Sequence, residues 1–201
     1  MGEITGIEWT DKTHNYWYGC KKVSQGCRHC YAEREMTKFG RSFQTITRAK
    51  GFDKPLSWKE PAKVFVNSWS DYFIEEADEW RAEAWDIIRQ TPHLTYQILT
   101  KRTELVPDRL PHDWGNGYPN VWIGVSVEDQ ENADRRIPLL FKIPAIVRFL
   151  SCEPLLGPLD ISEWLTYDWR PADIGEETPR IDWIIIGGES GPHLAKPQYK
   201  H

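Results

Sequence analysis

The chain has 201 residues, of which 40% are hydrophobic and 27% charged, and its formal net charge is −5. This composition is typical of a globular domain, and the acidic balance argues against a protein that coats nucleic acid through bulk electrostatics. An enzyme that meets a nucleic-acid base through a local basic groove stays compatible with it. No run approaches 18 apolar residues and the N-terminus has no signal-peptide pattern, so we expect a cytoplasmic protein without a membrane segment.

Short β-branched or aromatic runs alternate with helical stretches along the chain. In order, the expected strands are 4–9, 63–69, 95–100, 121–127, 145–151 and 183–186, and the expected helices are 31–39, 76–90 and 129–140. This alternation indicates parallel βαβ units. Since no G-x-G-x-x-G follows the first strand, a doubly wound dinucleotide fold is disfavoured. We predict an α/β fold with one domain over residues 1–201, a partial (β/α)6 barrel of parallel strands.

Two irregular stretches are predicted as surface insertions. Residues 41–62 combine glycine, proline and basic residues with large aromatics, and residues 164–180 are rich in proline and acidic residues. The first stretch could contact nucleic acid through charge and stacking, although lysines of an ordinary surface loop explain it as well.

Polar side chains follow the second and later expected strands. They are Asn67, Ser68, Ser70 and Asp71 after the second, Lys101 and Arg102 after the third, Ser126, Glu128 and Asp129 after the fourth, Ser151, Cys152 and Glu153 after the fifth, and Glu189 and Ser190 after the sixth. In a (β/α) barrel these positions share the rim where active sites form, although loops are polar in general. We therefore expect one site at this rim, with Glu153 facing its mouth and Cys152 in the core.

The stretch YGCKKVSQGCRHCYAEREM, residues 18–36, holds Cys20, Cys27 and Cys30 in the spacing C-x6-C-x2-C. Tetrahedral zinc usually takes four ligands, and a nearby histidine or Cys152 could supply the fourth. A disulfide with a spare thiol is disfavoured in a reducing compartment. A 4Fe–4S cluster is held by cysteine thiolates, usually four, so three would leave one iron open. Spacing alone leaves these alternatives open.

The cysteine stretch resembles the cluster loop of the radical S-adenosylmethionine (SAM) superfamily, which follows the first strand of a six-stranded partial (β/α) barrel. The resemblance implies a 4Fe–4S cluster whose open iron binds SAM. It also implies reductive cleavage of SAM to a 5′-deoxyadenosyl radical, which abstracts hydrogen from a substrate. The second gap and the aromatic Tyr31 after the last cysteine match the superfamily pattern. The first gap is six residues long where three are usual.

Longer stretches resemble the phage- and prophage-associated radical-SAM-like family of undefined function. They are IEWTDKTHN, GC-x6-GC-x2-CYAE, VNSWSDYF, ILTKR, WIGVSVE, RFLSCEPLLGPLD and IDWIIIGGESGP, and they run from about Ile7 to Pro192. Phage association suggests a nucleobase in DNA or RNA as the substrate. Family members usually continue beyond GGESGP with a further helix and strand. The resemblance thus implies that a C-terminal family segment is missing here and that a partner protein could complete the barrel.

The resemblance also implies roles for particular side chains. Cys20, Cys27 and Cys30 would ligate the cluster and take part in catalysis. SAM needs an acceptor for its ammonium, a cation for its carboxylate and polar contacts to its ribose. The residues implied for these contacts are Asn67, Ser68, Ser70 and Asp71 for the ammonium, Lys101 or Arg102 for the carboxylate, and Ser126 and Glu128 for the ribose. Reduction would require a protein such as a flavodoxin or ferredoxin.

Weaker expectations complete the set. Glu189 lies in a glycine-rich turn that permits close approach of a ligand, so it could bind SAM or substrate and is included among the catalytic candidates. Asp11, His14 and Asn15 precede the cysteines and are expected to shape their loop. The competing hypothesis is a zinc-stabilised module that binds nucleic acid or a protein without catalysis, with the metal on the same three cysteines.

Overall fold

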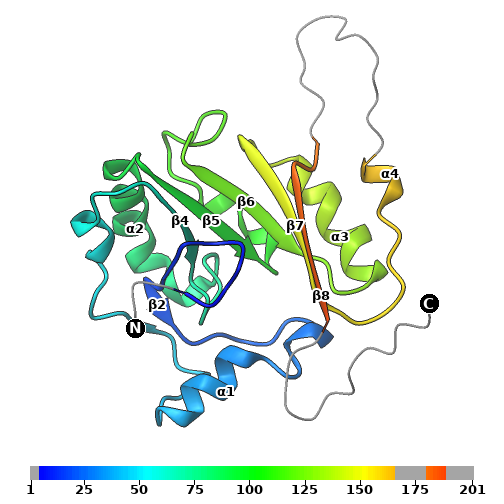
Figure 1. Ribbon diagram of the computed structural model, residues 1–201, viewed down its shortest axis with the longest axis horizontal. Helices are drawn as coiled ribbons and strands as arrows, with labels where there is room; N and C mark the ends of the chain where they lie inside the picture. Colours follow the sequence, from blue (N-terminus) through cyan, green and yellow to red (C-terminus); the bar gives the residue numbers. More distant parts are fainter. Residues whose placement is uncertain (1–4, 166–179, 189–201) are drawn as a thin grey trace, which may run out of the picture.

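A parallel sheet forms the centre of the molecule in the computed structural model, which describes residues 5–165 and 180–188 (Figure 1). Its six strands lie in the order β1-β4-β5-β6-β7-β8, all parallel, and curl into a half-barrel. They are β1 (Lys12–His14), β4 (Ala62–Val66), β5 (Leu94–Thr100), β6 (Val121–Ser126), β7 (Val147–Leu155) and β8 (Trp183–Gly188). The predicted α/β fold with a partial parallel barrel is therefore confirmed.

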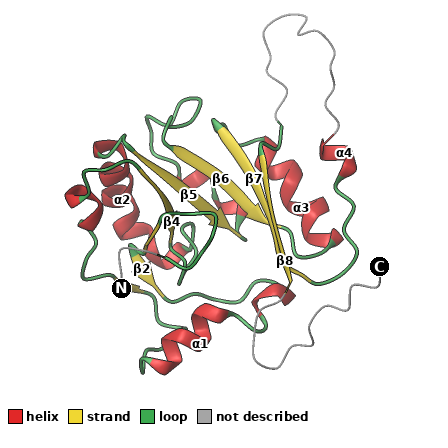
Figure 2. Cartoon of the chain, in the orientation of Figure 1, coloured by secondary structure: helices red, strands yellow, loops and turns green. Residues whose placement is uncertain are grey.

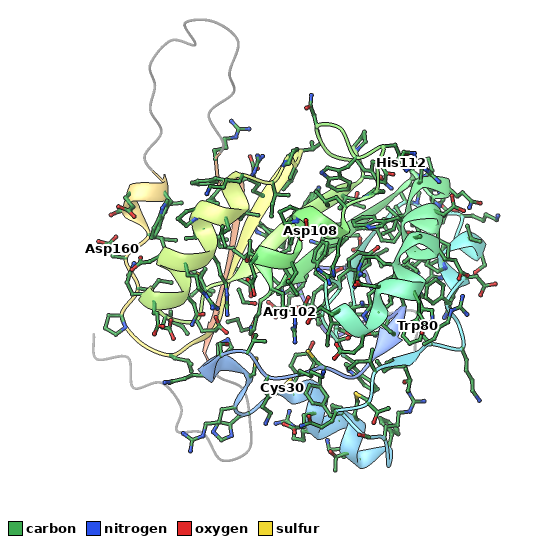
Figure 3. All side chains as sticks on the ribbon, turned by 180° about the vertical axis from the view of Figure 1, so that it is seen from behind. Cys30, Trp80, Arg102, Asp108, His112 and Asp160 are labelled. Atoms are coloured by element: carbon green, nitrogen blue, oxygen red, sulfur yellow. The ribbon has the colours of Figure 1, made fainter. Side chains whose placement is uncertain are left out.

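The helices lie on two sides of this sheet. They are α1 (Tyr31–Lys38), α2 (Asp78–Gln90), α3 (Gln130–Phe141) and the short α4 (Ser162–Leu165). Seen from behind, α2 and α3 cover the outer face (Figure 3), whereas α1 lies apart at one edge with the cysteine-bearing segment (Figure 2). Asp129 caps α3 by accepting a hydrogen bond from the backbone N–H of Asn132 at 2.9 Å, as short polar caps commonly do. In the described residues, no helix combines the length and hydropathy that crossing a membrane requires.

The prediction of a first strand at residues 4–9 is wrong for the residues that the structure describes. The first strand is β1, which pairs in parallel with β4 through Lys12↔Val64 to His14↔Val66. Trp9 instead packs its ring on Phe65, with centroids 4.7 Å apart. Trp9 therefore packs against the sheet, although residues 5–9 do not pair with a strand. Asp11 fixes the start of β1, because its Oδ2 accepts the backbone N–H of Lys63 at 2.7 Å.

Residues 41–62 contribute to the core, which differs from the expected surface insertion. Phe52 and Trp58 are buried and belong to the main hydrophobic cluster. His14 lies between them: its ring is 5.9 Å from that of Trp58, and its Nε2 hydrogen-bonds to the carbonyl of Phe52 at 3.2 Å. Burial lowers the pKa of His14 to about 4, so a neutral histidine anchors this segment rather than the cysteine loop. Most of the second expected insertion lies outside the described residues.

A small two-stranded antiparallel sheet lies between β1 and the cysteines. It consists of β2 (Trp17–Tyr18) and β3 (Thr47–Arg48). Short 3-10 turns complete the fold: η1 (Gln25–Cys27), η2 (Lys54–Ser57), η3 (Glu75–Ala77), η4 (Thr103–Leu105) and η5 (Pro107–Arg109). The cysteine loop, residues 18–31, follows β2 and ends at the start of α1. It thereby reaches the carboxyl ends of the sheet strands.

Candidate functional site

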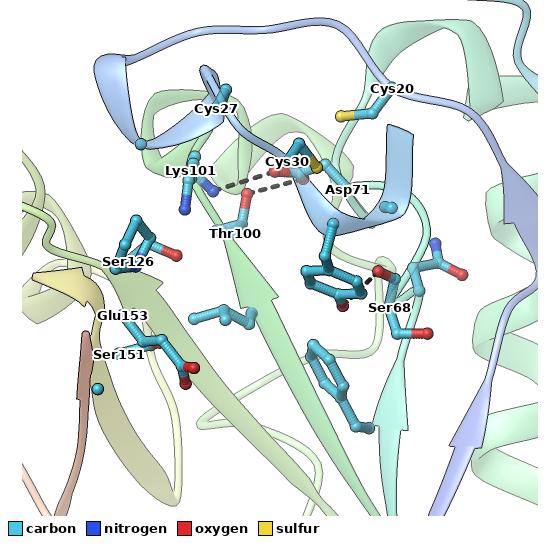
Figure 4. A pocket seen from close by; sticks show the side chains of 18 of the residues that line it. Cys20, Cys27, Cys30, Ser68, Asp71, Thr100, Lys101, Ser126, Ser151 and Glu153 are labelled. Atoms are coloured by element: carbon cyan, nitrogen blue, oxygen red, sulfur yellow. Dashed lines mark hydrogen bonds between the residues drawn. The ribbon is translucent and has the colours of Figure 1, made fainter. Parts of the chain in front are cut away.

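A cavity of about 640 Å³ lies where the cysteine loop meets the carboxyl ends of the parallel strands (Figure 4). Its walls include all three clustered cysteines, which are free thiols. Polar residues from the strand ends complete the wall: Asn67, Ser68, Ser70, Asp71, Thr100, Lys101, Arg102, Ser126, Ser151 and Glu153. This volume is in the range of small-molecule sites. The structure therefore brings the cysteines and most of the expected strand-end residues together around one space.

Cys20 is held tightly at the start of the loop. Its backbone N–H donates to the carbonyl of Phe43 at 2.7 Å. The preceding Gly19 has φ +92°, and a Cβ there would lie 2.4 Å from the carbonyl oxygen of Thr45, so only glycine fits. Ser70 donates its hydroxyl to the carbonyl of Gly19 at 2.5 Å. The backbone around Cys20 is therefore fixed by two separate segments of the fold.

A buried ion pair lies beside the Cys20 thiol. Nη1 of Arg102 is 3.2 Å from Oδ2 of Asp71 and 3.7 Å from Sγ of Cys20. Burial and the Asp71 carboxylate raise the pKa of the Cys20 thiol to about 12, and Arg102 opposes this rise. The Cys20 thiol therefore lies in contact with a guanidinium that lowers its pKa against the effect of burial.

Asp71 is committed to the fold rather than to a ligand. Its Oδ1 accepts from the hydroxyl of Thr100 at 2.8 Å and from the backbone N–H of Phe73 at 2.9 Å. Its Oδ2 accepts from the backbone N–H of Lys101 at 3.0 Å in addition to the contact with Arg102. A carboxylate has about four acceptor positions, and these are all occupied. Asp71 lines the cavity but is not available to an ammonium group.

A second buried ion pair supports the next turn of the loop. Oε2 of Glu128 accepts from Nη1 of Arg136 at 2.5 Å, and both side chains are fully buried. Oε1 of Glu128 accepts from the hydroxyl of Ser24 at 2.5 Å and lies 3.3 Å from Nζ of Lys101. Burial alone would raise the pKa of Glu128, but Lys101, Arg136 and Ser24 together hold it below its ordinary value. Glu128 does not line the cavity, so its carboxylate is turned to the loop rather than to a ribose.

Gly26 shows how closely the loop rests on this pair. A Cβ at Gly26 would lie 2.5 Å from both Cγ and Oε1 of Glu128. The glycine before Cys27 is therefore required by contact with a buried side chain. Cys27 ends η1, and its Sγ is 3.8 Å from the hydroxyl of Ser24. The position of Cys27 thus depends on Glu128 through Ser24 and Gly26.

Cys30 is positioned by the docking of α1. It directly precedes the helix, and its carbonyl accepts the backbone N–H of Arg34 at 3.2 Å. The hydroxyl of Tyr31 donates to the carbonyl of Ser68 at 2.6 Å, which ties α1 to the turn after β4. Within α1, the side chains of Ala32 and Met36 are buried. The aromatic residue after the last cysteine thus joins the cysteine loop to the sheet.

The turn after β4 contains a buried polar group without a hydrogen-bond partner. Asn67 has φ 55°, and its Oδ1 accepts the backbone N–H of Tyr16 at 2.8 Å. Its Nδ2 is buried without a hydrogen-bond partner, so the side chain offers a donor and not an acceptor. Asn15 shapes this turn through its amide, which accepts from the backbone N–H of Trp69 at 2.8 Å and donates to the Ser68 hydroxyl at 3.2 Å.

Glu153 is the exposed carboxylate on the sheet side of the cavity. It belongs to β7, lines the cavity and points into it in Figure 4. A Cβ on Gly187 would lie 2.9 Å from its Cδ, so the glycine of β8 leaves room for it. Ser126 and Ser151 lie on the same wall. Glu189, the other expected carboxylate, lies outside the described residues.

Two partners of the loop were not predicted from the sequence, namely Ser24 and Arg136. Arg136 did carry a signal, since it falls on the same face of α3 as the buried Ala133, Ile137 and Leu140. A charged residue on an apolar stripe indicates a buried partner of opposite charge. Ser24 carried none, because a serine in a polar loop is ordinary.

The three thiols fit a group that takes cysteine thiolates. In the part of the chain that the structure describes, no three Cys, His, Asp or Glu side chains are grouped closely enough to hold one metal ion. Zinc–sulfur bonds of about 2.3 Å draw thiolates together on one ion, whereas the thiolates of a 4Fe–4S cluster bind different irons. Free thiols around one cavity, with a guanidinium on one of them, suit a thiolate-bound group.

Fold and site together define a parallel α/β half-barrel with a three-cysteine cavity at the carboxyl ends of its strands. A family model described as "Protein of unknown function (DUF5131)" matches residues 4–200, and the chain belongs to this family. Neither the comparison with curated proteins nor that with solved structures gives a match.

Proposed function

We propose that the protein is a radical SAM enzyme. The observation that carries the proposal is the ring of three free thiols, Cys20, Cys27 and Cys30, around one cavity at the carboxyl ends of six parallel strands. When bound, a 4Fe–4S cluster would supply the electron that cleaves SAM reductively, and the resulting 5′-deoxyadenosyl radical would take hydrogen from the substrate. The residues of the chain bind, orient and enclose the reactants.

The strand-end residues divide this work differently from what the resemblance implied. The hydroxyl of Ser68 lines the cavity and can accept a hydrogen bond from the ammonium of SAM, and Asn67 holds the turn beside it through the backbone N–H of Tyr16. Ser126 and Ser151 face the cavity and suit the ribose. Asp71, Ser70 and Glu128 hold the loop, and Lys101 neutralises Glu128. Glu189 stays a prediction as a ligand of SAM or substrate.

Glu153 is assigned to the substrate. It makes no hydrogen bond or ion pair within the described residues and is exposed at the cavity wall. A free carboxylate of this kind accepts hydrogen bonds from N–H groups, including the exocyclic amino group of cytosine. It therefore suits the polar edge of a nucleobase.

A surface beside the cysteines supports a nucleic-acid substrate. The guanidinium carbon of Arg41 lies 4.9 Å from the Tyr18 ring centroid, Tyr18 is 5.9 Å from Trp69, and Trp69 is 6.0 Å from Phe39. Phe39 is 66% exposed. Cys20 and Cys30 pack against the same small cluster as Tyr18 and Trp69. We name Arg41, Tyr18, Trp69 and Phe39 the aromatic platform; stacked aromatics with a cation bind single-stranded bases.

The charge of the segment that carries part of the aromatic platform also favours a nucleic-acid substrate. Residues 20–41 contain six basic and two acidic residues, a net charge of +4, whereas the whole chain carries −5. A local positive field of this kind attracts a polyanion. We propose a nucleobase in DNA or RNA as the substrate, a flavodoxin or ferredoxin as the reductant, and the cytoplasm as the location.

Metal content and visible spectrum of anaerobically purified full-length protein test the proposal. A radical SAM enzyme should be brown and carry about four irons per chain, and the dithionite-reduced protein should convert SAM to 5′-deoxyadenosine. Cys27→Ala should abolish this product. A colourless anaerobic preparation with one zinc per chain would instead establish the alternative, a zinc-stabilised module that binds nucleic acid or protein without catalysis.

A further inference from the structure

Arg102 contacts a clustered thiol directly and cannot easily move away from it. It is 6% exposed, and its Nη1 is shared between Sγ of Cys20 at 3.7 Å and Oδ2 of Asp71 at 3.2 Å. Its Nη2 donates to the carbonyl of Lys21 at 2.8 Å. Its backbone N–H donates to the hydroxyl of Thr100 at 2.9 Å, which in turn donates to Asp71. The guanidinium is therefore a fixed donor on the Cys20 sulfur.

The other two thiols lack such a partner. Sγ of Cys27 lies near the hydroxyl of Ser24, a neutral group. Within the described residues, no charged side chain hydrogen-bonds to the sulfur of Cys27 or of Cys30. Lys101, the next cation on the same strand end, is directed to Glu128 instead. Among the three clustered thiols, Cys20 is therefore the one whose sulfur a charged side chain contacts in the described residues.

A fixed cation on one thiolate changes the charge balance of a group bound there. One-electron reduction of a 4Fe–4S cluster from the 2+ to the 1+ state adds one negative charge, and hydrogen bonds to the ligand sulfurs are among the factors that set the potential. The guanidinium favours the added electron. The Asp71 carboxylate contacts the same Nη1 of Arg102, and its negative charge disfavours the added electron; burial keeps both effects strong. The two members of the pair therefore act in opposite directions.

We propose that the Asp71–Arg102 pair sets the reduction potential of the cluster through the sulfur of Cys20, with Arg102 raising the potential and Asp71 lowering it. The inference rests on the proposed function, because it assumes a 4Fe–4S cluster on the three thiols. It makes Arg102 and Asp71 positioning residues, which act on the cluster through Cys20.

The experiment is an anaerobic redox titration, with dithionite as the electron donor, of the reconstituted full-length protein and its variants, followed by electron paramagnetic resonance. Arg102→Met should lower the midpoint potential and Asp71→Asn should raise it. We expect each to change the ratio of reduced to oxidised protein at a fixed potential about tenfold, which corresponds to about 59 mV for a one-electron couple. Arg102→Lys keeps the charge and should fall between wild type and Arg102→Met.

Arg34→Met is the matched control. Arg34 lies on α1, outside the cavity wall, with a side chain that is 40% exposed and paired with Glu35 at 3.6 Å. Its loss removes one positive charge near the loop without changing a contact to sulfur. The midpoint potential of this variant should equal that of wild type.

Iron content separates the failure of this inference from that of the proposed function. Wild-type protein that takes up no 4Fe–4S cluster overturns both. A cluster in wild type with Arg102 and Asp71 variants that shift the potential in the same direction, or by no more than Arg34→Met, overturns the inference alone. If Arg102→Met takes up no cluster, Arg102→Lys and Asp71→Asn still decide the result, because a structural role cannot give them opposite signs.

Discussion

Two buried ion pairs hold the cysteine loop, and they differ in what they face. The Asp71–Arg102 pair lines the cavity and contacts the Cys20 sulfur. The Glu128–Arg136 pair is fully enclosed and reaches the loop through Ser24 and the backbone of Gly26. A carboxylate after a strand of the half-barrel can therefore line the cavity or lie wholly within the fold.

The two ion pairs also support the segment between Cys20 and Cys27. The six residues between Cys20 and Cys27 begin at the carbonyl of Lys21, which Arg102 holds, and end at Gly26, which rests on Glu128. Lys101 and Arg102 are adjacent at the end of β5, and each serves one of the two pairs. The loop thus spans the two pairs, and its extra length is part of a supported structure.

The largest effect on stability is expected from Arg136→Met, which leaves the Glu128 carboxylate buried with only Lys101 as a charged partner. Removing one member of a buried pair costs about 3–5 kcal/mol. The free energy of unfolding in guanidinium chloride should fall by this amount.

Arg135→Met is the control for that prediction. Arg135 is the neighbouring residue on α3 and is exposed, so its loss should change stability by less than about 0.5 kcal/mol. If the two variants unfold at the same denaturant concentration, the Glu128–Arg136 pair does not stabilise the fold.

Gly26→Ala should produce the next largest loss. The added methyl would meet Glu128 at 2.5 Å, and Arg136 and Ser24 hold the Glu128 carboxylate, so overpacking of about 1–3 kcal/mol is expected. Thermal unfolding would register it. At Gly51 a Cβ has its nearest neighbour at 4.0 Å, and Gly51→Ala should leave the midpoint nearly unchanged. Equal effects at the two glycines would contradict the contact between Gly26 and Glu128.

The pH dependence of stability should separate the Glu128–Arg136 pair from ordinary surface charges. The pKa of Glu128 is lower in the folded protein than its ordinary value, which for an unfolded glutamate is about 4.3. Its ionised form therefore stabilises the fold above that pH, and this contribution is lost as the pH falls through the folded-state pKa. Denaturant unfolding from pH 6 to pH 3 should show a smaller acid loss in Glu128→Gln than in wild type. Parallel curves for the two proteins would refute the assignment.

The sequence predicted the sheet well because five of its strands are apolar runs between helices. It failed at β1, a three-residue strand whose position is set by pairing with β4 and not by its own composition. The polar rim was also predictable, since a strand that ends in polar residues points them to the same edge. The roles at that rim were not predictable to the same degree.

Asp71 and Glu128 show why the roles differed. The pattern reveals that a carboxylate follows a strand, but not that Arg102 or Arg136 will neutralise it from an element elsewhere in the chain. Gly26 is a similar case: a glycine before a cysteine indicates a turn, whereas its physical reason is the buried side chain beneath it. Which side chains are buried and which charged partners they meet is decided by the tertiary structure, so the pattern of a single sequence does not reveal it directly.

The smallest effect on stability is expected at Phe39, which belongs to the aromatic platform and to neither ion pair. Its side chain is 66% exposed, so Phe39→Ala should change the free energy of unfolding by less than about 0.5 kcal/mol. Binding of a fluorescent single-stranded oligonucleotide, measured by anisotropy at fixed salt, should nevertheless weaken, because one stacking contact contributes about 1–3 kcal/mol. Leu56→Ala, at another exposed apolar side chain (39%), is the matched control and should bind as wild type does. If Phe39→Ala binds like Leu56→Ala, the aromatic platform does not bind the nucleic acid.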